Sequence, residues 1–195
     1  MSAKPEKEER GHRLLRDILE TVALTLVLLL VVRLTVQHYY IDGPSMEPTL
    51  HNQEYILVDR LAYLFHPPQR GDIIVFHYPR DPSVDYVKRI IAVPGDTITV
   101  IGQTVIVDGV TLHEPYTNPD DPASLAVYPP IRNLVIGPDQ YFVMGDNRGD
   151  SSDSRQWGTV PKQDIVGKAT LVYWPLGANN FGLLPDESSV FAGIK

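Results

Sequence analysis

A long apolar run near the N-terminus constrains this chain more than any other feature. The 19 residues from Ile18 to Val36 are largely apolar, and no charged residue interrupts Thr21 to Val32. As a helix rising about 1.5 Å per residue, the run measures roughly 28 Å, close to the hydrocarbon thickness of a bilayer. Glu20 and Arg33 lie near its ends, where long side chains reach the headgroups. The run predicts one transmembrane helix over residues 18–36.

Cations precede the run and indicate its orientation. They are Lys4, Lys7, Arg10, Arg13 and Arg16. By the positive-inside rule, we expect residues 1–17 in the cytoplasm and residues 37–195 as an extracytoplasmic domain at the cell membrane. Two alternatives remain. A cleaved signal peptide needs a small-x-small cleavage site, which Leu34 to His38 does not offer, and a buried soluble helix needs a polar face, which the run lacks.

Composition excludes several classes of function. The formal net charge is −7, whereas a nucleic-acid-binding protein normally presents a basic face. The chain has no cysteine, which rules out thiolate catalysis, zinc–cysteine sites and disulfides. No His-Glu-x-x-His spacing is present, so a zinc protease of that type is not indicated.

After residue 36 the pattern becomes that of short strands. Expected strands cover residues 55–58, 72–78, 86–93, 97–100, 104–107, 140–144 and 165–174. Turn signals separate them, among them Asp108-Gly109, which favours a hairpin. The sequence therefore predicts a mainly β domain of antiparallel sheets. Prolines crowd residues 113–133, which indicates a long surface excursion, and about 103–140 is a candidate for an inserted small β lobe.

The first candidate for chemistry is Ser45, within Gly43-Pro44-Ser45-Met46-Glu47-Pro48. Two prolines restrict the backbone and Gly43 permits unusual dihedral angles, so the serine is expected on a rigid turn. A nucleophile needs such fixed placement. The competing interpretation is an ordinary turn serine.

The second candidate is Lys88, in an expected strand. Alternation places Tyr86, Lys88 and Ile90 on one face and Arg89 on the other. A buried lysine loses part of its preference for the charged form and can act as a base near neutral pH, whereas arginine cannot. The alternative is a solvated structural lysine.

A polar loop over residues 145–155 is the third candidate. Its hydroxyls could orient a neutral lysine amine, and its acids and arginines can form ion pairs. A calcium loop is the alternative, but Arg148 stands where an oxygen ligand is required. His77 is the alternative to Lys88 as base, in a Ser-His-Asp arrangement, although a lone strand histidine more often packs.

Four ordered segments together resemble type I signal peptidases. They are Ser45-Met46-Glu47-Pro48-Thr49-Leu50, Arg70 to Phe76, Lys88 to Asp96, and Gly145 to Arg155. The resemblance extends from residue 18 to about 174. It implies a mainly β signal-peptidase fold with one N-terminal transmembrane helix, and an endopeptidase that uses serine and lysine without metal or cofactor.

The resemblance also assigns roles to individual residues. Ser45 would be the nucleophile, Lys88 the general base, and Ser151 the hydroxyl that hydrogen-bonds the lysine amine. Gly145 would leave room beside that lysine, and Met46 would help line the pocket for the residue before the cleaved bond. Asp153 and Arg155 would hold the last segment together.

Gly43 departs from part of the pattern. Some members carry a serine there, whose hydroxyl helps to bind the oxyanion. With glycine, we expect the oxyanion on the Ser45 backbone N–H, together with a donor from Gly43 or a water.

The implied substrates are signal peptides of exported preproteins, bound as an added strand and cut after small residues of the Ala-x-Ala type. The implied surroundings are a phospholipid membrane and the export machinery, with no nucleic acid. Three rivals remain: a non-catalytic β domain, a Ser-Lys protease with other substrates, and a self-cleaving regulator. The last needs a DNA-binding domain, for which residues 1–17 are too few.

Overall fold

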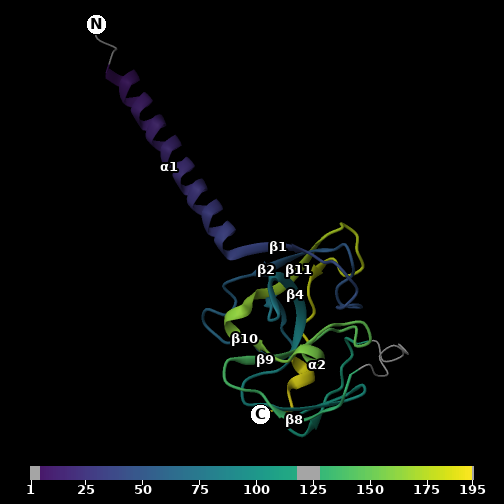
Figure 1. The fold of residues 1–195 in the computed structure, drawn as a ribbon. Coiled ribbons are helices and arrows are strands. Elements are labelled where there is room, and N and C mark those ends of the chain that lie inside the picture. Colours follow the sequence, from purple (N-terminus) through teal and green to yellow (C-terminus); the bar gives the residue numbers. More distant parts are fainter. Residues whose placement is uncertain (1–4, 118–127, 195) are drawn as a thin grey trace. The chain divides into compact units, whose positions relative to one another are not determined.

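The computed structural model describes residues 5–117 and 128–194 (Figure 1). Lys4, and Pro119 and Pro122 of the predicted surface excursion, lie outside the described residues. The chain divides into two compact units between Val36 and Gln37.

The N-terminal unit is a single helix, α1 (Pro5–Thr35). It begins well before the predicted span and ends one residue earlier, because Val36 already belongs to a strand. Within the described parts of the chain, no helix combines the length and apolar character needed to cross a bilayer. The expected transmembrane helix over residues 18–36 is therefore not confirmed. Asp17, Glu20 and Arg33 share α1 with the apolar run, and charges inside a membrane are costly.

The second unit is built on an antiparallel sheet, which confirms the mainly β class. Its strand order is β1-β2-β11-β3-β4-β9-β10, with β12 paired to β11. The strands are β1 (Val36–Tyr40), β2 (Tyr55–Asp59), β3 (Ile73–Tyr78), β4 (Asp81–Ala92), β9 (Gln140–Met144), β10 (Val160–Pro161), β11 (Ile165–Trp174) and β12 (Gly182–Leu183). Strand β4 is longer than predicted and pairs with β3 along its first part and with β9 along its last.

A smaller antiparallel sheet has the order β7-β6-β5-β8. Its strands are β5 (Thr97–Ile101), β6 (Thr104–Val107), β7 (Val110–Thr111) and β8 (Ile131–Val135). Within the described residues, this unit also has three short helices: α2 (Ser154–Trp157), η2 (Lys162–Asp164) and η3 (Ser188–Phe191).

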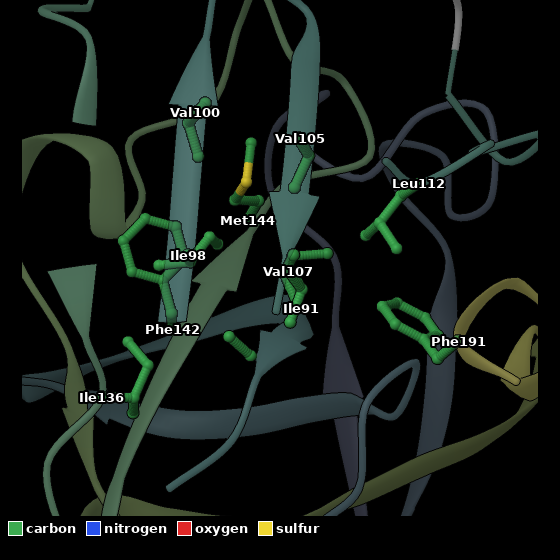
Figure 2. Close-up of a cluster of buried hydrophobic side chains, with 11 residues drawn as sticks. Ile91, Ile98, Val100, Val105, Val107, Leu112, Ile136, Phe142, Met144 and Phe191 are labelled. Atoms are coloured by element: carbon green, nitrogen blue, oxygen red, sulfur yellow. The ribbon is translucent and has the colours of Figure 1, made fainter. Parts of the chain in front are cut away.

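A shared apolar core joins the two sheets. Ile91, Phe142 and Met144 of the larger sheet pack against Ile98, Val105 and Val107 of the smaller one (Figure 2). The C-terminal segment contributes Phe191, whose ring faces Leu112 in the same view. Burial of these apolar side chains stabilises both sheets together. The close-packed core therefore fixes strand β4, which carries Lys88, and strand β9, which leads into the 145–155 loop.

Candidate active site

Ser45 lies on an irregular turn between β1 and β2. Two backbone bonds shape it: the Glu47 N–H donates to the Pro44 carbonyl (3.0 Å) and the Leu50 N–H to the Met46 carbonyl (2.9 Å). The side chains of Met46 and Leu50 are buried in a core cluster beneath the turn. Ser45 itself is half-buried. Met46, expected to line a substrate pocket, thus lies in the apolar core and anchors the nucleophile turn.

Strand β4 brings Lys88 to this serine. The Lys88 amine donates hydrogen bonds to Oγ of Ser45 (2.7 Å) and to the carbonyl of Val87 (2.9 Å). Only 4% of the residue is exposed. A serine hydroxyl and an amine at this distance are in reach for proton transfer.

Burial lowers the pKa of Lys88 from its ordinary value of 10.5 to about 8. Desolvation is the main cause, because the charged ammonium loses its hydration in the protein interior. The carboxylates of Asp153 and Asp146 oppose this by favouring the cation, and the nearby Arg155 guanidinium adds to the lowering. The amine is therefore mostly charged at pH 7, and its neutral fraction grows as the pH rises through about 8.

Ser151 lies in the same polar loop but bonds elsewhere. Its hydroxyl donates to Oδ2 of Asp153 (2.8 Å), and among the described residues the Lys88 amine makes hydrogen bonds only to Ser45 and Val87. Asp153 is fully buried and ion-pairs with Arg155 in a bidentate arrangement (2.7 and 2.8 Å). It also caps α2 and accepts the Gly145 N–H (3.0 Å). One carboxylate therefore fixes several parts of the loop.

Gly145 has no space for a side chain. A Cβ there would lie 2.6 Å from Cβ of Ser151 and still closer to its Oγ and to the carbonyl oxygen of Ser45. Contacts under 3.0 Å do not occur for real Cβ atoms. Ser151 and the carbonyl of Ser45 therefore occupy the space beside Gly145. The role that the resemblance implies, leaving room beside Lys88, stays a prediction.

A buried ion pair ties the turn to β4. Arg89, next to Lys88 and pointing to the opposite face, binds Asp146 through Nε (2.9 Å) and Nη2 (2.7 Å), and both residues are fully buried. The Thr49 hydroxyl donates to Oδ2 of Asp146 (2.6 Å). Charge-assisted, bidentate bonds of this kind fix geometry. The pair thus holds the end of the nucleophile turn against the strand of the lysine.

Other bonds restrain the turn around the serine. Asn147 donates its backbone N–H to the Ser45 carbonyl (3.2 Å) and its side-chain amide to the Pro44 carbonyl (3.2 Å). The Gly43 N–H donates to Oδ1 of Asn52 (2.9 Å), so it is not free for an oxyanion. Gly43 has φ +106°, which favours glycine. The Ser45 N–H, by contrast, has no acceptor among the residues that the structure describes.

His77 does not take part in this arrangement. Its Nδ1 lies 2.6 Å from Oδ1 of Asp85, and its side chain is half exposed. The imidazole has no bond to Ser45 in the described structure, whereas the Lys88 amine has one.

A cleft of about 400 Å³ opens at Ser45 and Lys88. Its lining includes Tyr39 and Tyr40 of β1, Val84 to Val87 of β4, and the buried apolar side chains of Ile41, Ile56 and Val75. Both flanking strands present unpaired edges. Strand β1 is the end strand of its sheet, and the described pairs of β4 place β9 only opposite Arg89 to Ala92. Unpaired strand edges are sites at which extended peptides can add as a further strand.

A family model described as signal peptidase, peptidase S26, matches residues 15–174. This chain belongs to that family. As a member of the signal peptidase family it is a peptidase, and therefore a hydrolase. The match includes the nucleophile turn, β4 and the polar loop, and it removes the non-catalytic domain from the rival interpretations.

Individual relatives agree with the family match. The chain is 40% identical over 181 residues to probable signal peptidase I-1 of Synechocystis, with 87% of each protein covered. It is 38% identical over 183 residues to signal peptidase I of Leptolyngbya laminosa, with 90% of this chain and 86% of the relative covered. A crystal structure of a signal peptidase I from Enterococcus faecalis is 31% identical and covers 52% of this chain and 95% of its own, with TM-score 0.43.

The sequence did not predict the roles of several residues that position the site in this signal peptidase family member. Thr49, Asn52 and Asn147 hold the turn through side-chain bonds that join distant positions. Asparagine and threonine near a proline turn are common, so the sequence alone does not single them out. The motif positions of Thr49 and Asn147, inside two of the four ordered segments, were the only available signal.

Proposed function

We propose that this chain removes signal peptides from exported preproteins, with Ser45 as nucleophile and Lys88 as general base. The observation that carries the proposal is the 2.7 Å contact between a buried lysine amine and a serine hydroxyl that both line a cleft of about 400 Å³. A lowered lysine pKa supports it, because a base must be neutral at working pH.

The reaction is acyl transfer. Lys88 takes the proton of the Ser45 hydroxyl while Oγ attacks the scissile carbonyl carbon. The C–N bond then breaks, and the lysine ammonium gives the proton to the leaving amine. A water molecule then attacks the acyl-enzyme ester and gives a proton to the Lys88 amine. The ester bond to Ser45 breaks, and the lysine ammonium returns the proton to Oγ of Ser45. No step needs a metal or cofactor.

The oxyanion of the tetrahedral intermediate is assigned to the Ser45 backbone N–H. That donor has no acceptor among the described residues, and backbone donors aimed at developing charge stabilise such intermediates. Gly43 is a poor second donor, because its N–H is bonded to Asn52. Its role is instead to give the turn its positive φ.

The substrate segment would bind extended between β1 and β4. Cleavage after small residues of the Ala-x-Ala type is proposed from the resemblance, and the apolar lining of Ile41, Ile56 and Val75 is compatible with small apolar side chains. Ser151 is proposed to act on Lys88 through Asp153, to which it donates and whose charge raises the pKa of the amine.

Membrane association is a further part of the proposal. Many leucine and valine side chains between Leu14 and Val32 are about half exposed or more on α1, and apolar surface of this extent is unfavourable in water. We assign it to lipid contact, which predicts that the protein sediments with membranes and that detergent releases it. The orientation with residues 1–17 in the cytoplasm, and association with export machinery, stay predictions.

The test is cleavage of a purified preprotein with an Ala-x-Ala site. The proposal expects a single cut after the second alanine, identified by mass, and loss of the cut when a leucine replaces that alanine. A Ser45→Ala variant gives the background. Cutting at unrelated sites, or no dependence on the alanine, would assign the chain to a peptidase with other substrates.

A further inference from the structure

The C-terminal segment beyond the family match reaches back to the nucleophile turn. The match ends at residue 174, whereas Asn180 lies six residues later. Its side-chain amide donates to the Thr49 carbonyl (3.0 Å) and to Oε2 of Glu54 (2.9 Å). In Figure 1 the yellow C-terminal segment passes the turn that follows β1.

Asn180 is itself held in place. The Ala178 N–H donates to the Pro175 carbonyl (3.2 Å), and the Phe181 N–H to the Ala178 carbonyl (3.0 Å). Directly afterwards, β12 pairs with Leu171 and Val172 of β11. The tail therefore presents the amide from a braced turn, which limits the entropy lost on making its bonds.

The two acceptors belong to the closing part of the nucleophile turn. Glu54 is buried, and its Oε2 also accepts the His51 N–H (2.8 Å). A buried carboxylate that loses a donor costs free energy. Asn180 thus bridges Thr49 with the Glu54 and His51 pair, on either side of Leu50.

Thr49 is where the tail and the catalytic strand meet. Its carbonyl accepts a hydrogen bond from Asn180, and its hydroxyl donates one to Asp146. Asp146 in turn pairs with Arg89, the neighbour of Lys88. The Leu50 N–H donates to the carbonyl of Met46. This bond extends the restraint on Thr49 to Met46, the residue next to Ser45. Thr49 is therefore held by hydrogen bonds to Asp146 and to Asn180, and of these two residues Asp146 lies in the family-matched region and Asn180 beyond it.

We infer that Asn180 is a positioning residue for the nucleophile: through Thr49 and Glu54 it sets the distance between Ser45 and Lys88. The inference rests on the proposed function. A serine misplaced by about 1 Å can cost on the order of 100-fold in rate, so partial loosening should cost less.

The test compares Asn180→Ala with wild type on the preprotein, with Asn179→Ala as matched control, because Asn179 is the exposed neighbour. We expect kcat of Asn180→Ala to fall about tenfold. We expect KM to stay within about twofold, because the substrate cleft is unchanged. Asn179→Ala should match wild type, and Asn180→Gln should recover part of kcat. Melting temperatures taken alongside separate slower chemistry from a smaller folded fraction.

Other outcomes overturn the inference. A kcat of Asn180→Ala within about twofold of wild type contradicts it, as does a loss that the folded fraction accounts for completely. Should Asn180→Ala fail to fold, Asn180→Ser decides, because it removes the amide that donates to Thr49 and Glu54: reduced kcat in a folded protein supports positioning, and wild-type kcat overturns it. In these cases wild type still cuts and the proposed function stands. A folded wild type that does not cut refutes both.

Discussion

The amine of Lys88 lies 2.7 Å from the hydroxyl of Ser45, although 43 positions separate the two residues in the chain. A strand fixes the lysine, and a turn with buried Met46 and Leu50 fixes the serine. The lysine is desolvated by the same packing that positions it, so placement and basicity have one physical origin.

Lys88→Arg should abolish cleavage, although it keeps the positive charge. The guanidinium does not lose its proton at working pH and cannot accept one from Ser45. We expect kcat/KM to fall by about 10³-fold or more, in line with loss of a general base. Lys162→Arg, at an exposed position, is the control and should leave kcat/KM unchanged.

The pH profile of wild-type cleavage should follow the titration of Lys88. Its pKa is lowered to about 8, and only the neutral amine acts as base. We therefore expect kcat/KM to rise with pH through about 8 and to level off above it. A profile that is flat between pH 6 and 9, or that falls over this range, would mean that another group is the base.

Lys88→Met should stabilise the protein while removing activity. At pH 7 the wild-type ammonium is charged in both states, and its burial costs the folded state free energy that methionine avoids. We expect the free energy of unfolding to rise by roughly 1–3 kcal/mol at pH 7.

The same linkage predicts how the stability difference depends on pH. Between pH about 8 and 10.5 the unfolded state binds more protons than the folded one, so wild type gains stability with pH and the difference should shrink. Denaturant melts at pH 7 and pH 10 measure this. A Lys88→Met variant that is less stable at pH 7 would show that the amine stabilises the fold.

Gly145→Ala should damage both stability and catalysis. The new methyl group would overlap Ser151 and the Ser45 carbonyl, so the nucleophile turn must move. Overpacking of this kind costs about 1–3 kcal/mol, and displacement of Ser45 should lower kcat further. Gly137→Ala is the matched control, because its Cβ would meet only Cγ of Gln140 at 3.6 Å. Wild-type activity in Gly145→Ala would contradict the close packing described.

Asp153→Asn should move the pH profile as well as weaken the fold. The Asp153 carboxylate raises the pKa of Lys88, and its removal leaves Arg155, which lowers it. The midpoint of kcat/KM should therefore shift to lower pH. Breaking the buried pair with Arg155 should cost about 3–5 kcal/mol of stability.

The exposed Asp139 supplies the matched control for this shift. Its carboxylate is not among the groups that act on the pKa of Lys88, so Asp139→Asn should leave the midpoint in place. A midpoint unmoved in folded Asp153→Asn would show that the carboxylate does not act on the amine.

The sequence predicted the fold where burial leaves a pattern. The apolar runs at Ile73–Tyr78 and Ile165–Trp174 are central strands of the larger sheet. A central strand buries one or both of its faces, so its sequence carries a recognisable apolar pattern. Strand β8 (Ile131–Val135) was missed. It is largely exposed and carries Arg132 and Asn133, so no apolar alternation marks it.

The site was predictable where it follows motifs and not where it depends on distant partners. Ser45 and Lys88 stand in ordered segments, and the structure brings them together. Met46 could not be placed, because adjacency to the nucleophile does not say whether a side chain faces the cleft or the core. The bond from Asn180 to Thr49 spans 131 positions, and no local pattern encodes it.

The most direct measurement of the proposed dyad is preprotein cleavage by detergent-solubilised wild type, Ser45→Ala, Lys88→Ala and His77→Ala. We predict that the serine and lysine variants fall to background, while His77→Ala keeps wild-type kcat/KM, because the imidazole is paired with Asp85. Retained activity in Lys88→Ala, or its loss in a folded His77→Ala, would contradict the Ser45–Lys88 dyad.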